Sequence, residues 1–594
     1  MVHLRHRLAA GLPEEWDKTV NNGPFTYVSP LIVSTRNHEE GVYAIKVRQI
    51  LRHGFPYDPH TGDRSLRSWI FDCMLFYPLA PFAWIAGGDI QKGWILAHAS
   101  LAVLWTLFFF GLFRRCGAEH EYSLLFATAA FFFLDVFMWP FLNIMTALPV
   151  PRDLATRLFF LPARATGPVQ FMRLPTPGMT FLWLYGALAA SVLLAAAPRR
   201  RAAAAVLTGI LVASLCLAHF YEWTFGVACL AFLLAAAMFF EPPGPWRWNL
   251  AAANAVSLAI SAAYYLFASR MTSGVMGDII YRMGTPGERY FVPSSPAYLV
   301  LAYVFWRHSR RFSGAARWIW LSAAVQEAAC FPLLNLSLLL GYNMQFDHYH
   351  MMGSFTSAVF CLCWLAESKP LKRALKPHAA VLVAAIFAWV ALREKSWADT
   401  HYRLFGTPRD VASAAEWMNG HVPPGSTLLA LSGALTEFLP QRLDMTWAVA
   451  NGSPSYGSPI PTARNLEGIA RIVKTVGADP DRFLSERWAN FPTLDARKQL
   501  RTYLTRNLAW EETDREAWPY FLLNIRAWRL TPGGWEEGEF RRYYRQSPPI
   551  PRPFYLWLQK GDEALLTKTP EALGGGLIYE NPSVRLYRFS DGPA

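Results

Sequence analysis

Charged residues are scarce in this sequence, and their scarcity excludes several classes of protein. They make up 17% of the 594 residues, whereas about 25% is usual in soluble domains. The net charge is +13, but no stretch forms a basic patch that could follow the phosphates of a nucleic acid. Residues 1–30 contain no apolar core of a signal peptide, so no cleavable signal is expected. The sequence also lacks internal repeats and low-complexity segments.

Cysteine is missing from the C-terminal third of the chain. The last of the seven cysteines is Cys363, so no disulfide can form beyond it. Cys361 and Cys363 form a C-x-C pair inside an apolar run. Small apolar packing residues are a better interpretation of this pair than metal ligands.

Long apolar runs are present instead, and they set the fold class. Runs such as 95–113 are long enough to cross the hydrocarbon core of a bilayer, which takes about 20 residues. We therefore predict a polytopic α-helical membrane protein with about 10–12 transmembrane helices. The segment 69–89 is apolar but carries Asp72, Pro78 and Pro81, so its interpretation stays open. The predicted spans are 93–113, 121–143, 178–197, 202–219, 222–241, 248–268, 296–307, 318–341, 351–367 and 378–394.

Lysine and arginine gather in alternate loops between these spans, which predicts the orientation in the membrane. Cytoplasmic loops carry an excess of these residues, and all the basic loops can be cytoplasmic at once. The other loops, including 144–177 and 269–295, then lie outside together with the tail from about residue 395. The basic segments are Arg114–Arg115, 198–201, Arg247, 307–311 and 368–377.

The tail, 395–594, is predicted to be a folded extracytoplasmic domain of the α/β or α+β class. Thr407 is expected to cap a helix with Pro408 in its first turn, and a strand is expected after the Pro423–Gly425 break. The run LIYENPSVRLYRF near the end is typical of a β-hairpin. We therefore predict three parts: an N-terminal segment 1–92 with amphipathic juxtamembrane helices, a transmembrane domain 93–394 and this tail.

The N-terminal segment contains a charged amphipathic stretch, EEGVYAIKVRQ, at residues 39–49. Glu39 and Glu40 precede a helical run that carries Tyr43, Lys46 and Arg48. In polytopic glycosyltransferases of the GT-C superfamily, an acidic pair in an outer loop likewise precedes a Tyr-centred helix with basic residues. The stretch resembles that pattern.

Four further segments extend this resemblance to roughly residues 20–395. HGFPYDPHTG is similar to the extended segment that follows the family's acidic helix, and RLPTPGMTFLWL resembles the start of a mid-chain span in bacterial members. LAHFYEWTF and GYNMQFDHYH look like motifs at the outer ends of spans. The segments begin at residues 53, 173, 217 and 341.

The resemblance implies a reaction on the outer face of a bacterial inner membrane. A carboxylate would deprotonate an acceptor hydroxyl, and a polyprenyl phosphate would leave from the sugar with inversion. Glu39 is the preferred base and Glu40 the second, with Asp153 as a further carboxylate ahead of Asp278. The implied partners are the lipid-linked sugar, the bilayer and a membrane protein bound through the tail, and no cofactor is expected. The residues implied in substrate binding are Tyr43, Lys46, Arg48, Arg152, Arg173, His219, His348 and His350.

Each of these residues also has an ordinary structural interpretation. Acids at a helix N-terminus favour the helix dipole, and arginines in outer loops anchor to lipid headgroups. His348 and His350 could hold a metal, but interfacial hydrogen bonding is the better interpretation. Glu222 and Glu327 lie at or inside spans, where acids are functional by default, although a neighbouring helix could supply a partner.

Two models of the N-terminal segment remain, because the first span of the family is not visible in residues 1–35. In one, residues 1–92 lie outside and 69–89 lies on the membrane or re-enters it. In the other, the N-terminus is cytoplasmic and 69–89 is the first span, which would place Glu39 and Glu40 on the wrong face. A non-catalytic GT-C-like subunit whose outer domain binds a partner is the alternative function. A transporter is a third alternative, although no repeat supports it.

Overall fold

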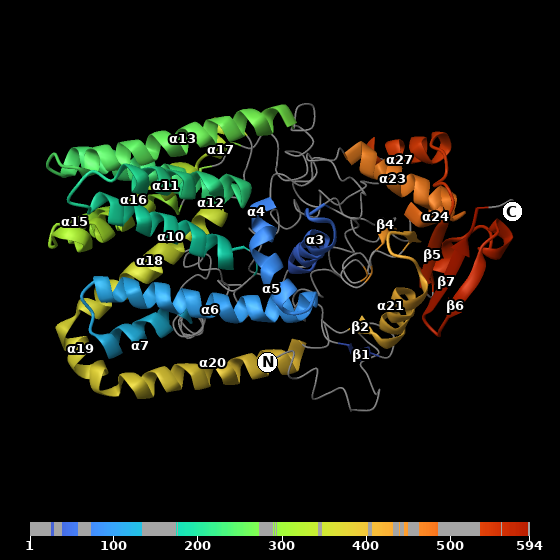
Figure 1. Cartoon of the computed structure of the whole chain (residues 1–594), viewed down its shortest axis with the longest axis horizontal. Coiled ribbons are helices and arrows are strands. Elements are labelled where there is room, and N and C mark those ends of the chain that lie inside the picture. Colours follow the sequence, from blue (N-terminus) through green and yellow to red (C-terminus); the bar gives the residue numbers. More distant parts are fainter. Residues whose placement is uncertain are drawn as a thin grey trace.

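In a computed structural model of the chain, most of the helical region and much of the tail are described (Figure 1). Asp153, Arg152 and Arg173 lie outside the described residues. Glu39 and Glu40 are placed only as the first residues of a helix. The described residues are 25–28, 39–57, 73–132, 174, 176–271, 289, 291–292, 294–341, 347–401, 407–431, 439, 443, 445–449, 462–484, 535–559 and 561–591.

Long apolar helices form most of the described structure, which confirms a multi-pass α-helical protein. Seven helical segments in the described part of the chain are long and apolar enough to cross a membrane. They comprise α6 (Ile90–Arg115), α10 (Gly178–Ala195), α12 (Phe220–Phe240), α13 (Trp246–Met271), α16 (Gly314–Leu334) with α17 (Ser337–Leu340), α18 (Asp347–Glu367), and α19 (Lys369–Leu375) with α20 (Ala379–His401).

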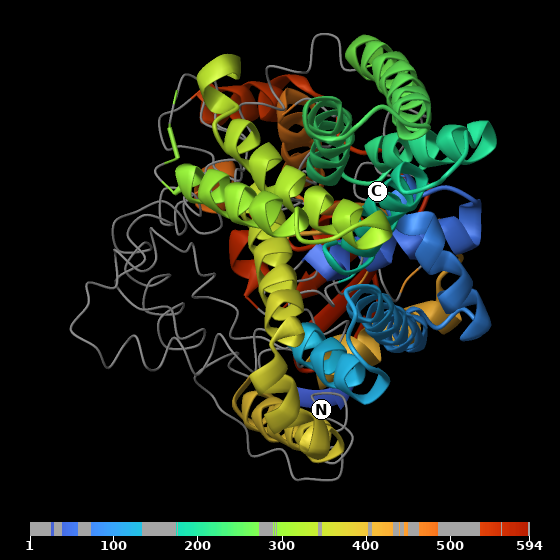
Figure 2. The ribbon, with the colours of Figure 1, turned by 90° about the vertical axis from the view of Figure 1, so that its left-hand side faces the viewer.

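Three shorter helices lie among them where spans were also predicted: α7 (His120–Phe131), α11 (Ala202–Ser214) and α15 (Ser295–Ser309). The bundle packs around buried aromatic rings, with Trp105 of α6 donating from its indole nitrogen to the Gly178 carbonyl at 2.9 Å. The outer helix faces carry exposed apolar side chains such as Leu107, Leu258 and Val381. Such faces suit contact with lipid tails rather than water. Figure 2 shows the bundle end-on, with α20 at its edge beside α7.

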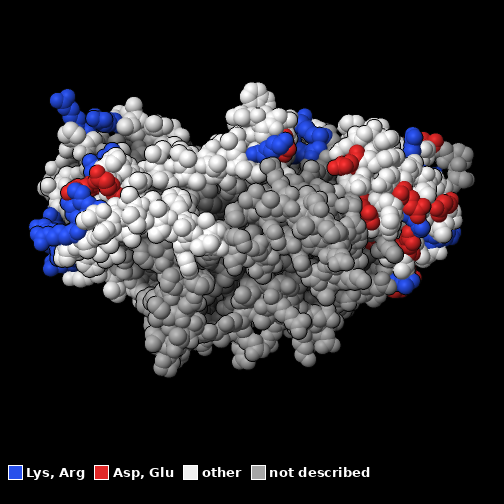
Figure 3. Space-filling model, turned by 90° about the horizontal axis from the view of Figure 1, so that it is seen from below, with Lys and Arg blue, Asp and Glu red and all other residues white. Residues whose placement is uncertain are grey.

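One end of the bundle carries the basic loops, and we call it the basic end. Helices α6, α10, α12, α15 and α18 finish there. Figure 3 shows Lys and Arg concentrated at this end, whereas charges of both signs are mixed at the opposite end of the molecule. Its basic residues are Arg114, Arg115, Arg199, Arg200, Arg201, Arg247, Arg307, Arg310, Arg311, Arg317, Lys369, Lys372, Arg373 and Lys376.

A five-stranded sheet forms the centre of the tail, in the order β4-β3-β5-β7-β6. Strand β3 (Thr427–Ala430) is parallel to β4 (Thr446–Val449) and β5 (Phe554–Gln559). Strand β7 (Val584–Phe589) is antiparallel to β5 and to β6 (Gly576–Glu580). The β6–β7 pair is the predicted terminal hairpin.

Helices cover both faces of this sheet because successive strand residues point to opposite sides. Leu429 and Leu556 face α23 (Thr462–Thr475) and α27 (Trp535–Gln546). Leu428 and Trp557 face α21 (Arg409–His421) instead.

Two described elements of the N-terminal segment, β1 (Phe25–Val28) and α3 (Glu39–His53), lie between the helical bundle and this sheet (Figure 1). Strand β1 pairs antiparallel with β2 (Thr407–Pro408), just before α21. Helix α3 packs against α5 (Ala80–Ile85) and α4 (Cys73–Phe76). We call this end of the bundle, where α6, α10, α12 and α18 begin, the domain end.

Two local predictions are corrected by these elements. The helix expected after Thr407 is present as α21, but it begins only at Arg409; Thr407 and Pro408, expected as its cap and first turn, form β2 because their backbone pairs with β1. The apolar segment 69–89 was a candidate span, yet its described helical part runs only from Cys73 to Ile85 and is divided into α4, η2 (Tyr77–Leu79) and α5. Thirteen helical residues extend about 20 Å, whereas the hydrocarbon core is about 30 Å thick. This part is therefore too short to cross as a helix.

Candidate functional site

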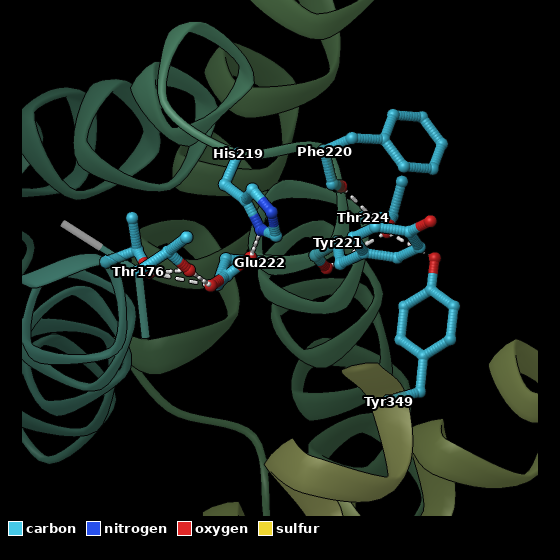
Figure 4. Close-up of polar contacts among 8 residues, drawn as sticks. Thr176, His219, Phe220, Tyr221, Glu222, Thr224 and Tyr349 are labelled. Carbon is cyan, nitrogen blue, oxygen red and sulfur yellow. Dashed lines mark hydrogen bonds and ion pairs between the residues drawn. The ribbon is translucent and has the colours of Figure 1, made fainter. Parts of the chain in front are cut away.

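The first turn of α12 holds a histidine and a carboxylate that contact each other at the domain end. His219 precedes the helix with an extended backbone, and Glu222 follows three residues later in its first turn. This spacing brings the side chains onto one face of the helix. The Nδ1 atom of His219 contacts the Oε2 atom of Glu222 (Figure 4). An acid in a first turn is also favoured by the helix dipole.

The carboxylate of Glu222 is buried and hydrogen-bonded by a second helix. Its side chain is only 1% exposed. The hydroxyls of Thr180 and Thr176 donate to its Oε1 atom at 2.7 and 3.2 Å, and the two hydroxyls lie 3.0 Å apart. Since α10 begins at Gly178, these threonines come from its start. A buried carboxylate requires such donors, so α10 and α12 together fix its position.

A second imidazole lies beside the first. The rings of His219 and His348 are 5.3 Å apart between centroids. The ring of Tyr221 stacks on His348, with centroids 4.2 Å apart and an angle of 1° between the planes. The hydroxyl of Tyr349 lies 2.8 Å from that of Thr224 on α12. The first turn of α18 is therefore joined to the first turn of α12 (Figure 4).

His350 belongs to different surroundings, although it was grouped with His348 in the sequence. It is buried, and its Nδ1 and Nε2 atoms lie 2.9 and 3.2 Å from the hydroxyls of Tyr298 and Ser294. These hydrogen bonds join α18 to α15 and its N-terminal turn. Among the described residues, no group of three or more His, Cys, Asp or Glu side chains could hold a metal.

Helix α3 presents its predicted residues next to α4. The ring of Tyr43 lies 5.7 Å from that of Phe76, and the Lys46 ammonium lies 5.0 Å from the centre of the same ring. Arg48 is half-buried on the same helix. Gln49, which was not predicted as a site residue, is buried. The packing of α3 fixes the helix whose first residues are Glu39 and Glu40.

Glu327 forms a separate polar site inside the bundle. It is fully buried on α16, and its Oε1 atom accepts a hydrogen bond from Ser357 of α18 at 2.8 Å. The neighbouring helix thus supplies the partner that sequence reasoning allowed.

Sequence reasoning found His219, His348 and Glu222 but missed the two threonines. The run TPGMT carries them four residues apart, a spacing typical of one helix face, but nothing in it indicates a carboxylate from α12. What the cluster can do chemically follows from the pair. A carboxylate at Nδ1 fixes the orientation of the imidazole ring. A ring held in this way can accept or donate a proton at its other nitrogen.

No protein-family model matches this chain, and no curated protein matches it either.

Proposed function

We propose that this protein is a membrane glycosyltransferase of the GT-C type. It transfers a sugar from a polyprenyl-phosphate-linked donor to an acceptor on the outer face of the bacterial inner membrane. The basic end lies in the cytoplasm by the positive-inside rule, so the domain end and the tail are extracytoplasmic. Glu39 is the preferred base, and Glu40 is the second candidate.

The observation that carries this proposal is the pairing of β1 with β2. It holds residues 25–28 beside the tail, and α3 begins only eleven residues later at Glu39. Helix α3 packs against α4, and α4 contacts η5 (Leu215–Leu217), which ends two residues before His219. The acid pair and the His219–Glu222 pair are thus carried by segments at the same end of the bundle. This favours the model in which residues 1–92 lie outside.

The proposed reaction uses groups that these segments supply. A glutamate accepts the proton of the acceptor hydroxyl, and the oxygen attacks carbon 1 of the sugar opposite the phosphate. The bond between carbon 1 and the phosphate oxygen breaks, and the polyprenyl phosphate leaves with its electron pair. General-base catalysis of this kind contributes about 10²–10⁴-fold to a rate. Arg152 and Arg173 are proposed to neutralise the phosphate because guanidinium groups match its oxygens, and His219 and His348 are proposed to line the same site.

The activity test uses purified protein in liposomes with a panel of polyprenyl-phosphate-linked sugars. The release of polyprenyl phosphate is measured for the wild type, Glu39→Gln, Glu40→Gln and Glu416→Gln. Glu416 is an exposed carboxylate on α21 and serves as the control for the same chemical change. We expect a loss of about 10²-fold or more in Glu39→Gln and none in the control. Full activity of Glu39→Gln would show that another group is the base.

A sidedness test addresses the orientation separately. In a background without the native cysteines, Ser413→Cys on the tail should react with an impermeant maleimide in intact cells. Lys369→Cys at the basic end should react only after permeabilisation. The opposite pattern would exclude an outer-face reaction. If no donor is consumed while a stoichiometric partner copurifies, the non-catalytic subunit becomes the better interpretation.

A further inference from the structure

We infer that the turn between α10 and α11 binds the headgroup of an anionic phospholipid. The proposed site consists of Arg199, Arg200 and Arg201 in this turn, together with Trp248 in the first turn of α13. We call these four residues the arginine turn. The inferred ligand is the phosphodiester of a membrane lipid at the basic end. This inference does not depend on the proposed glycosyl transfer.

The backbone of the arginine turn is fixed by one buried side chain. The amide nitrogen of Asn249 donates to the carbonyls of Arg199 and Leu194 at 3.1 and 3.2 Å. Its amide oxygen accepts from the backbone nitrogen of Arg201 at 2.9 Å. Asn249 lies on α13 and is 2% exposed. The three arginines are therefore presented from a defined backbone, which lowers the ordering cost of binding.

An aromatic side chain completes the arginine turn at the level expected for the membrane surface. The guanidinium of Arg200 lies 4.7 Å from the centre of the Trp248 ring. The Trp248 side chain is 61% exposed, whereas the side chain of the next residue, Asn249, is buried. Tryptophan prefers the boundary between headgroups and acyl chains. An arginine held against it is placed where lipid phosphates occur.

No described carboxylate pairs with the arginines of the turn, in contrast to other cations at the basic end. Elsewhere at the basic end, Lys372 and Lys376 form ion pairs with Glu119, and Arg317 pairs with Glu241. In the part of the chain that the structure describes, no carboxylate forms an ion pair with the three arginines of the turn. Adjacent unpaired arginines attract anionic lipid, and guanidinium groups bind phosphate oxygens in pairs.

The helices below the turn offer a surface for the acyl chains. Helices α11 and α13 lie side by side. Val206, Leu207 and Ile210 of α11 and Leu258 of α13 are exposed apolar residues. A lipid whose phosphate contacts Arg200 could therefore lay its chains along these faces. The structure thus supplies a charged, an aromatic and an apolar component for one lipid.

The test is retention of lipid by the full chain. The protein is placed in nanodiscs of phosphatidylcholine with a minor fraction of phosphatidylglycerol, then extracted in mild detergent and examined by native mass spectrometry. We expect bound phosphatidylglycerol on the wild type and a several-fold loss in the double variant Arg199→Gln/Arg200→Gln. The matched control is Lys372→Gln/Lys376→Gln, which removes two positive charges at the same end. We expect it to retain the lipid, because those charges are already paired with Glu119.

Two further variants separate a built site from diffuse surface charge. Trp248→Ala keeps the charge and replaces an exposed side chain, so folding should be unaffected while lipid retention falls. Asn249→Ala releases the turn at unchanged charge and should also lower retention. Equal lipid loss in the lysine control would overturn the inference in favour of diffuse charge. Wild-type retention in the arginine double variant would overturn it outright, and the arginines would then serve only to orient the chain.

Discussion

Substitution of Gly93 by alanine tests how the N-terminal segment is fixed to the bundle. Gly93 lies in the first turn of α6, where the helix crosses α5. A Cβ atom built there would lie 2.7 Å from the backbone nitrogen of Ala83 and closer still to its Cα atom. These are backbone atoms of a buried residue, so no side-chain rotation can make room. Helix α5 would have to move, and α3 packs against it.

The size of the effect follows from two opposing terms. Carbon atoms in contact are about 3.5–4.0 Å apart, so α5 must shift by roughly 1 Å. Overpacking of this kind costs about 1–3 kcal/mol, whereas alanine gains about 0.8–1.0 kcal/mol over glycine in a helix. The difference of the two terms is a loss of up to about 2 kcal/mol in the free energy of unfolding of Gly93→Ala. Gly111→Ala is the matched control on the same helix, because its Cβ atom would meet nothing within 4 Å.

The assay is thermal unfolding of both variants in detergent, followed by tryptophan fluorescence. Gly93→Ala should lower the midpoint, and Gly111→Ala should leave it unchanged or raise it. A second readout is the reaction rate of Cys73, which is buried on α4, with a small maleimide. This rate should rise only in Gly93→Ala. If both variants unfold and react like the wild type, α5 does not cross α6 at Gly93, and the placement of α3 loses its support.

Three other predictions concern the remaining contacts. Glu222→Leu should destabilise the protein by about 1–3 kcal/mol because buried hydroxyls lose their acceptor. Glu222→Gln should lower the free energy of unfolding by less because its amide oxygen is still an acceptor. Equal thermal unfolding midpoints for the two variants would contradict this. Hydrogen bonds from Lys372 and Lys376 lower the pKa of Glu119 to about 2, so its stabilising effect is complete above about pH 4.5 and is lost as the pH falls toward 2. Glu119→Gln should therefore flatten the pH dependence of the unfolding midpoint in that window, most clearly at low salt. Thr26 and Thr407 are paired in register. In a background without native cysteines, cysteines at these two positions should cross-link on mild oxidation. If cysteines at Thr26 and at the exposed Ser413 cross-link equally well, the β1–β2 pairing is refuted.

The positions of the helices and the basic loops were determined by the sequence itself. Hydropathy acts over each segment alone, so runs of apolar residues identify the spans without knowledge of their neighbours. The terminal hairpin follows from alternation and a turn at Asn581–Pro582 for the same reason. The contact of His219 with Glu222 is also local, since three residues separate them in one turn.

Tertiary structure decided what surrounds these groups and where strand β1 lies. Thr176 and Thr180 reach Glu222 only because α10 packs against α12, a contact over more than forty residues of sequence. His348 and His350 are two residues apart, yet packing directs one to Tyr221 and the other to α15. Pairing of β1 with β2 holds residues 25–28 beside the tail. Strand pairing joins segments nearly four hundred residues apart, and no local pattern encodes that choice of partner.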